Sequence, residues 1–202
     1  LPISSLSATK SLVIDDEGYY WVATNTGLHQ FRYNKKDRVL NKINRFTYNP
    51  VDPNSLSKDL IKELYKDKTG IIWIGTNGGG VNKVNPKKKQ FLHIKKTLEF
   101  NSLSYDKIRS FFEDSYGNLW IGTEGGGLNL LPQSQSNDFN TFKRFESVNR
   151  AFALEELIVK NKKKLLIGDG NRRGLFMLDI EDAINKDNTS VEKFLETSNS
   201  VF

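Results

Sequence analysis

A pair of adjacent arginines, Arg172 and Arg173, stands in a short polar stretch that begins at Asn171. Two guanidinium groups in one loop can hold a carboxylate or a sulfate, because each presents several N–H donors in a fixed planar geometry. Tyr105 is suited to stack on a sugar ring, since its ring is apolar and its hydroxyl can hydrogen-bond. These residues predict a site for an acidic or hydroxyl-rich ligand. The alternatives are a degenerate solvent loop for the arginines and ordinary packing for Tyr105.

Four further polar residues are candidates for the same ligand site, because the repeat pattern described below places their loops on one rim of the fold. They are Lys58, Asn77, Lys107 and Glu124. Binding groups are commonly carried on such loops, which a rigid scaffold holds in place.

The sequence does not place residues suited to catalysis or metal binding at the spacings that such sites require. Asp15, Asp67 and Asp114 recur at one place in a repeat, so we interpret them as turn residues whose carboxylates accept backbone N–H groups. His29 and His93 stand alone, without a neighbouring ligand at metal-binding spacing. The sequence has no cysteine, and its glycine-rich turns lack the Gly-Lys-Ser/Thr of a phosphate loop. We therefore expect no catalytic residue, no metal site and no cofactor.

The elements that position these residues follow from an internal repeat. The segment Gly117–Leu131 copies Gly70–Val84, and Gly18–Leu28 is a shorter copy. A fourth copy, Leu165–Gly170, keeps the register but has Leu166 in place of tryptophan. The tryptophans of the first three copies stand about 50 residues apart, a period typical of folds built by stacking one small unit.

One repeat unit reads as four short β-strands. Apolar and aromatic runs such as 108–113 and 119–123 are separated by turn sequences rich in glycine, asparagine and aspartate. Four antiparallel strands in a unit of about 40 to 50 residues are typical of a propeller blade. The predicted fold class is therefore all-β, with four-stranded antiparallel blades that form a partial β-propeller of about four blades.

The repeated tryptophans are predicted to form the core between blades. Trp21, Trp73 and Trp120 are bulky enough to fill the space between stacked sheets, and Gly75 and Gly122 would let the neighbouring backbone approach closely. We expect one partial propeller domain over residues 1–202, with blades at approximately 4–47, 54–97, 101–146 and 147–196, and the start of a further blade at 197–202.

The repeat resembles a known family. Its pattern is Asp-x-x-Gly-x-Leu/Ile-Trp-Ile-Gly-Thr-x-Gly-Gly-Gly-Leu/Val, preceded by Asn-Ser-Leu-Ser at 54–57 and 101–104. This pattern resembles the two-component regulator propeller repeat, which builds the extracytoplasmic sensor region of hybrid two-component histidine kinases, notably in glycan-degrading gut bacteria. The resemblance extends over nearly the whole chain and is strongest in the second and third units.

The resemblance implies a periplasmic segment of an inner-membrane protein that responds to oligosaccharide breakdown products. It also implies rings of about seven blades. The remaining blades and C-terminal domains of a parent protein would then be partners, and only the parent chain would reach the membrane. Four blades of such a ring leave two apolar faces uncovered, so we expect the fragment to self-associate. The arginine pair and the net charge of +6 favour acidic sugars.

Composition and charge limit the classes of protein to which the chain can belong. A chain of 202 residues with 37% hydrophobic residues can bury a core, and no apolar run approaches the roughly 18 to 20 residues of a membrane helix. The sequence has no methionine start or signal-peptide pattern, so we interpret it as an excised piece.

The lysine-rich stretches 35–38, 87–89 and 160–164 are predicted turns on the opposite rim, either solubilising or polyanion-binding. No aromatic residues are interleaved with them, so nucleic acid is not an expected partner.

Three function classes are compatible with the sequence. The favoured one is the ligand-binding, signal-input part of a hybrid two-component histidine kinase. In that case the segment itself is not an enzyme. The first alternative is a protein-interaction or dimerisation scaffold without its own ligand. The second is a propeller lyase or glycosidase, for which the sequence offers no convergent acid–base pair.

Overall fold

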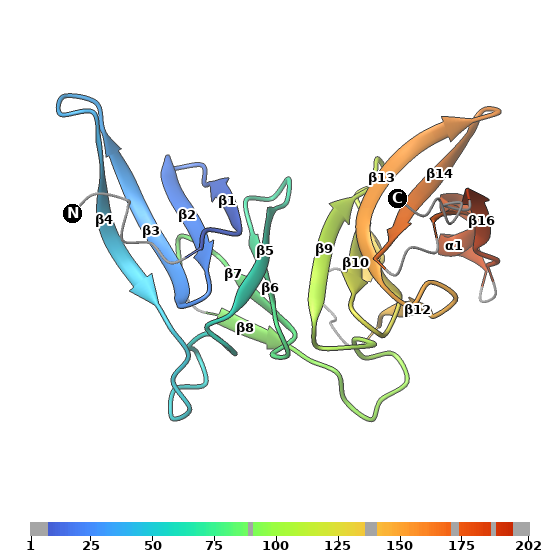
Figure 1. Ribbon diagram of the computed structural model, residues 1–202, viewed down its shortest axis with the longest axis horizontal. Coiled ribbons are helices and arrows are strands. Elements are labelled where there is room, and N and C mark those ends of the chain that lie inside the picture. The colour runs from blue at the N-terminus through green and yellow to red at the C-terminus, as the bar shows by residue number, and fades with distance from the viewer. Residues whose placement is uncertain (1–7, 89–90, 136–140, 171–173, 187–188, 196–202) are drawn as a thin grey trace, which may run out of the picture. The chain divides into compact units, whose positions relative to one another are not determined.

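The chain folds into four antiparallel β-sheets of four strands each (Figure 1). The computed structural model describes residues 8–88, 91–135, 141–170, 174–186 and 189–195. In every sheet the strands lie in sequence order, and each strand is hydrogen-bonded to the next. The predicted all-β fold of four-stranded propeller blades is therefore confirmed. We call the four sheets blades 1 to 4 in chain order.

The strands of each blade have the following bounds. Blade 1 contains β1 (Ser11–Ile14), β2 (Tyr19–Thr24), β3 (Gly27–Asn34) and β4 (Val39–Phe46). Blade 2 contains β5 (Ile61–Lys66), β6 (Ile72–Thr76), β7 (Val81–Val84) and β8 (Phe91–Ile94). Blade 3 contains β9 (Ile108–Glu113), β10 (Leu119–Thr123), β11 (Leu128–Leu131) and β12 (Lys143–Phe145), with the short 3-10 helix η2 (Gln133–Gln135) after β11. Blade 4 contains β13 (Ala151–Val159), β14 (Lys162–Asp169), β15 (Leu175–Asp179) and β16 (Glu192–Leu195), with helix α1 (Ile180–Asn185) between the last two strands.

A tight turn closed by an aspartate joins the first two strands of blades 1 to 3. In blade 3, Oδ1 of Asp114 accepts the backbone N–H groups of Tyr116 at 3.0 Å and Asn118 at 2.9 Å. Gly117 has a φ of 83°, in the left-handed region that favours glycine. The prediction that these aspartates accept backbone N–H groups is confirmed, and it explains why the Asp-x-x-Gly spacing recurs.

The same aspartates also bind the repeated tryptophans, which the sequence did not predict. The second carboxylate oxygen accepts the indole N–H in the pairs Asp15–Trp21, Asp67–Trp73 and Asp114–Trp120, each at 2.8 Å. A buried indole N–H needs an acceptor, and the aspartate supplies it from within the same hairpin. Each hairpin therefore holds its own tryptophan through a bond that does not involve a neighbouring blade.

The contacts divide the chain into two compact units. The first comprises blades 1 and 2 with residues 106–108, and the second comprises residues 96–105 with blades 3 and 4 from Arg109 onward. Each unit has a core between its own two blades. In the first unit Trp21 packs against blade 2, and in the second Trp120 packs against blade 4. Both tryptophans are fully buried, as the sequence predicted, and Trp73 is also buried.

The Asn-Ser-Leu-Ser segments are tied to the third strand of the blade that follows them. In blade 2 the side-chain oxygen of Asn82 accepts the N–H of Ser57 at 2.9 Å, and its Nδ2 donates to Ser57 Oγ at 2.8 Å. Asn129 makes the same two bonds to Ser104, at 2.9 and 2.8 Å. The segment therefore recurs because it anchors the chain as it crosses into the next blade.

Blade 1 has a histidine, His29, where blades 2 and 3 have this asparagine. The side chain is buried and stacks on Phe31, with 6.2 Å between ring centroids. Neither ring nitrogen has a hydrogen-bond partner among the residues that the structure describes. Burial lowers the pKa of His29 below its usual 6.5, and the positive charges of Lys42 and Arg45 add to this effect. The neutral imidazole is therefore the form that fits the fold.

Protonation of His29 is expected to destabilise the protein. Because its pKa is lowered in the folded state, its stabilising contribution is present above about pH 6.5 and is lost as the pH falls through the lowered value. Urea unfolding measured across this range should give a free energy that declines toward acid pH. The variant His29→Phe should decline less, whereas the control His93→Gln should behave like the wild type. An equal decline in His29→Phe would contradict the assignment.

Candidate functional site

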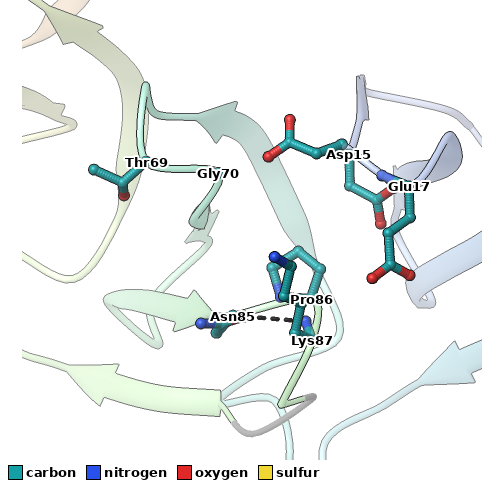
Figure 2. A pocket seen from close by; sticks show the side chains of 8 residues that line it. Asp15, Glu17, Thr69, Gly70, Asn85, Pro86 and Lys87 are labelled. Atoms are coloured by element: carbon teal, nitrogen blue, oxygen red, sulfur yellow. Dashed lines mark hydrogen bonds between the residues drawn. The ribbon is translucent and has the colours of Figure 1, made fainter.

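A small cavity in the first unit lies at the rim formed by the β1–β2, β5–β6 and β7–β8 turns (Figure 2). Its volume is about 90 Å³ and it is lined by Asp15, Asp16, Glu17, Thr69, Gly70, Asn85, Pro86 and Lys87. Asp15 already binds Trp21, and Asp16 forms an ion pair of 2.7 Å with Lys66, a hydrogen bond that lowers the pKa of Asp16. Asp15 therefore holds its own hairpin together, and Asp16 links the β1–β2 turn to β5.

The corresponding rim of the second unit contains a tyrosine in an unusual setting. The Tyr116 hydroxyl donates to the carboxylate of Glu181 at 2.6 Å, and Lys163 Nζ lies 4.0 Å from the ring centroid. The hydrogen bond to Glu181 raises the pKa of Tyr116 to about 12, because the neutral phenol is the donor. The tyrosine thus links the β9–β10 turn to helix α1.

Tyr116 is expected to lose its proton at a higher pH than the ordinary tyrosine pKa of 10.0. Because its folded pKa is raised, its contribution to stability is present below about pH 10 and is lost as the pH rises through about 12. A phenolate absorbance titration should show one late component that disappears in Tyr116→Phe. Glu181→Gln should move that component toward the ordinary tyrosine value. A late component that persists in Tyr116→Phe would show that another tyrosine produces it.

The other rim of the first unit brings two of the candidate ligand residues together. Asn77 and Lys107 pair through an isolated antiparallel bridge, and the backbone N–H groups of Gly78 and Gly80 donate to Asp106 at 3.0 and 2.9 Å. The β6–β7 turn is therefore held by the segment that leads into β9. This pairing fixes the backbone of both candidates.

Lys58, the other candidate in the first unit, extends over its own blade. Its ammonium lies 5.5 Å from the centroid of the Tyr48 ring, a cation–π contact. A Cβ built on Gly79 would lie 2.7 Å from Lys58 Cγ, so the lysine stem covers the glycine turn. The structure thus gives Lys58 a packing role over the β6–β7 turn.

In the second unit, Tyr105 covers the β10–β11 turn. A Cβ built on Gly125 would lie 3.4 Å from the Tyr105 ring, and one built on Gly126 would lie 2.7 Å from Tyr105 Cβ. Glu124 begins this turn and pairs with Arg150 through an isolated antiparallel bridge. Tyr105, in the segment before β9, thus packs over the β10–β11 turn that carries Glu124.

Glu124 forms an ion pair with Arg109, a residue that the sequence pattern did not single out. The contact joins Arg109 Nη2 to a carboxylate oxygen of Glu124, and each side chain is 22% exposed. Arg109 Cζ also lies 5.3 Å from the centroid of the Phe152 ring. Arg109 Nε is buried and has no hydrogen-bond partner among the described residues. Arg109 lies in β9 and Phe152 in β13, and both strands are labelled in Figure 1.

A glycine makes room for the phenylalanine of this group. A Cβ built on Gly170 would lie 2.6 to 2.7 Å from three atoms of the Phe152 ring, so alanine would not fit there without displacing the ring. Phe152 nevertheless stays 38% exposed. We call Tyr105, Arg109, Glu124 and Phe152 the arginine–aromatic cluster. It combines a charged donor, a charged acceptor and an exposed aromatic ring, which are the groups that bind hydroxylated rings.

The remaining candidates, Asn171, Arg172 and Arg173, lie outside the described residues. Within the described ranges no group of three or more histidine, cysteine or acidic residues could hold a metal ion. No helix in those ranges is long and apolar enough to cross a membrane.

Several solved structures have the same fold as this chain. The chain aligns over 96% of its length with the extracellular domain of a putative hybrid two-component system from B. thetaiotaomicron, at a TM-score of 0.75 and 22% identity. A second such domain from that organism aligns at a TM-score of 0.67 and 21% identity, again over 96% of this chain. Virginiamycin B lyase from Staphylococcus aureus aligns over 99% of this chain and 59% of its own, at 0.61 and 11% identity. At such identities the likeness establishes the β-propeller fold alone.

The repeats identify the chain more closely. Residues 55–78 and 102–125 match the family described as two component regulator propeller. The resemblance predicted from the sequence is therefore confirmed, and these two segments are two-component regulator propeller repeats. It spans 26% of the length of each of the two B. thetaiotaomicron domains. No curated protein matches the chain at a significant level.

Proposed function

We propose that the chain is part of the periplasmic, ligand-binding sensor of a hybrid two-component histidine kinase, and that it responds to an oligosaccharide. The observation that carries this proposal is the match of its repeats to the two-component regulator propeller family. The likeness of its fold to extracellular domains of putative hybrid two-component systems supports it. In this proposal the segment is not catalytic, and phosphotransfer belongs to cytoplasmic domains of the parent protein.

A sensor of this kind needs a ligand that favours one of two arrangements of the parent protein. The differential binding free energy is typically about 1 to 3 kcal/mol. The rim of the second unit offers suitable groups, because the Arg109–Glu124 pair supplies both donors and an acceptor beside the exposed Phe152 ring. A sugar ring held there would contact two blades, since Arg109 lies in blade 3 and Phe152 in blade 4.

The test is a thermal-shift screen of the intact propeller region, including this segment, against neutral and acidic oligosaccharides. Binding to the folded state raises the melting temperature by mass action, by an amount that grows with ligand concentration. A concentration-dependent shift with one class of sugar is the expected result. No shift with any sugar would contradict the proposal, provided that the protein gives a cooperative melting transition.

An interaction scaffold remains a second candidate, because one loop of the second unit presents two apolar side chains to solvent. Leu98 and Phe100 are 105% and 84% exposed. The loop is nevertheless fixed: Ser102 Oγ donates to Glu99 O at 2.9 Å, and Arg144 Nε donates to Ser102 O at 2.8 Å. A rigid loop with exposed apolar groups is a favourable docking element, since little conformational entropy is lost on binding.

The scaffold candidate predicts dimerisation of the intact propeller region through this loop. Light scattering after size-exclusion chromatography would then give a dimer for the wild type and a monomer for the double variant Leu98→Ser, Phe100→Ser. The same mass in both proteins would reject this role for the loop.

Self-association of the isolated fragment is proposed on separate grounds. Leu12 and Ile14, on strand β1 at the edge of blade 1, are both more than two-fifths exposed. A further blade of the parent protein would cover this apolar face, and in the fragment a second copy would do so. A monomeric mass for the fragment at high concentration would contradict this proposal.

A further inference from the structure

We propose that the arginine–aromatic cluster binds an uncharged sugar ring, with Phe152 as the stacking platform and the Arg109–Glu124 pair as the group that hydrogen-bonds the hydroxyls. This inference rests on the proposed sensor function and names its ligand class. It differs from the preference for acidic sugars that Arg172 and Arg173 predict from the sequence.

The cluster already contains an ion pair. The guanidinium of Arg109 is paired with the carboxylate of Glu124, and both side chains are mostly buried. A ligand carboxylate placed on Arg109 would lie beside Glu124, and two carboxylates at such a distance repel each other in a partly desolvated site. The pair therefore disfavours a uronate and does not penalise a neutral ligand.

The hydrogen-bonding groups of the cluster suit adjacent hydroxyls. Arg109 Nε is a buried donor without a partner in the described part of the chain. Because this atom is not exposed, a ligand would meet the pair through the exposed 22% of each side chain. A sugar hydroxyl can accept from a guanidinium N–H and donate to a carboxylate oxygen at the same time. Adjacent hydroxyls of one ring thus complement an arginine–carboxylate pair.

The Phe152 ring provides an aromatic platform beside these polar groups. Arg109 lies 5.3 Å from the Phe152 ring centroid, which accounts for one face of the ring. The side chain still exposes 38% of its surface, although Gly170 packs closely against it. An exposed aromatic side chain beside polar hydrogen-bonding groups suits the mixed surface of a pyranose ring.

The loop that carries Glu124 is held in place independently of any ligand. Tyr105 covers Gly125 and Gly126, and the backbone N–H of Gly125 donates to Asn149 O at 2.9 Å. The backbone of Glu124 therefore occupies a fixed position, so that little ordering cost is left for binding. Tyr105 acts as a positioning residue in this arrangement.

The experiment is calorimetric titration of the intact propeller region with xylo-, galacto- and gluco-oligosaccharides and with oligogalacturonides of equal length. We expect a neutral series to bind and the oligogalacturonides to bind at least about tenfold more weakly. Phe152→Ala should weaken the neutral ligand by about tenfold or more, because the stacking face is lost. The control Phe194→Ala removes an exposed phenylalanine from β16 of the same blade and should leave affinity unchanged.

A charge variant separates this site from a merely structural ion pair. Glu124→Gln keeps the shape of the side chain but frees the charge of Arg109. It should weaken the neutral ligand and strengthen the oligogalacturonide, whereas loss of a structural pair alone would change both in the same direction. Circular dichroism and melting curves should first establish that each variant is folded.

The outcomes distinguish this inference from the proposed function. Binding of oligogalacturonides alone would overturn the inference and leave the sensor proposal standing. So would binding of a neutral sugar that neither Phe152→Ala nor Glu124→Gln affects. Binding of no sugar at all would contradict the proposed function, and the inference would fall with it.

Discussion

Replacing Trp120 with alanine is expected to lower the free energy of unfolding by about 3 to 5 kcal/mol, the usual cost of truncating a buried aromatic residue. Trp120 is fully buried in the core of the second unit, where residues of blade 4 such as Leu165 and Ile167 belong to the same cluster. The truncation removes these contacts and leaves a cavity between the blades. It also leaves Asp114 without the indole N–H that its carboxylate accepts at 2.8 Å.

Chemical denaturation of the wild type and the variant gives this difference directly. Trp120→Phe is the matched control, since it retains most of the apolar volume but loses the hydrogen bond to Asp114. We expect it to be less destabilised than the alanine variant. Trp73→Ala should also cost about 3 to 5 kcal/mol, because Trp73 is buried and makes the corresponding bond to Asp67. A loss below about 1 kcal/mol would mean that the tryptophan is not part of the blade core.

The repeat made most of the fold predictable. Strands β6 and β10 lie within the copied segments, and the Asp-x-x-Gly turns precede them as the pattern indicates. The bond between Asp114 and Trp120 was missed, although the spacing is constant, because spacing alone does not show that the two side chains meet within a hairpin. A recurring aspartate before a recurring buried tryptophan is the signal that could have revealed it.

The fourth blade was harder to predict because it departs from the repeat. Lys162 and Lys164 were assigned to a turn, but they lie in β14. The turn is formed instead by Lys160 and Asn161, whose φ values of 50° and 63° suit a two-residue hairpin loop. The helix α1 was also missed. Its signal was Asp179, whose side chain accepts the N–H of Asp182 at 3.1 Å and so caps the helix.

The candidate site was predictable only in part, for a related reason. Glu124 and Tyr105 belong to loops whose place in the blade the repeat specifies. Arg109 and Phe152 lie in the first strands of successive blades, and their contact depends on how one blade packs on the next. The period of the sequence repeat does not predict a contact between side chains of two different blades. The position of Arg109 among the apolar and aromatic residues of strand β9 was the one local signal.

Replacing Gly122 with alanine is expected to cost about 2 to 4 kcal/mol, because the glycine of blade 3 packs directly against the backbone of blade 4. A Cβ at this position would lie 2.2 Å from both the carbonyl oxygen of Ala151 and the hydroxyl of Ser110. These two atoms are hydrogen-bonded to each other at 3.0 Å across the two blades. The added methyl group therefore has to separate the sheets and break that bond.

Gly168 provides a matched control for this prediction, because it occupies the corresponding place in blade 4. A Cβ on Gly168 would meet only the Cβ of Ala153 at 3.3 Å, with its backbone atoms at 3.9 Å. We therefore expect Gly168→Ala to change the free energy of unfolding by less than about 1 kcal/mol. Denaturant unfolding of the two variants, measured side by side, compares the same substitution at two equivalent positions. Equal losses would show that glycine is required by the hairpin itself, whereas a loss confined to Gly122→Ala assigns the requirement to the packing of one blade on the next.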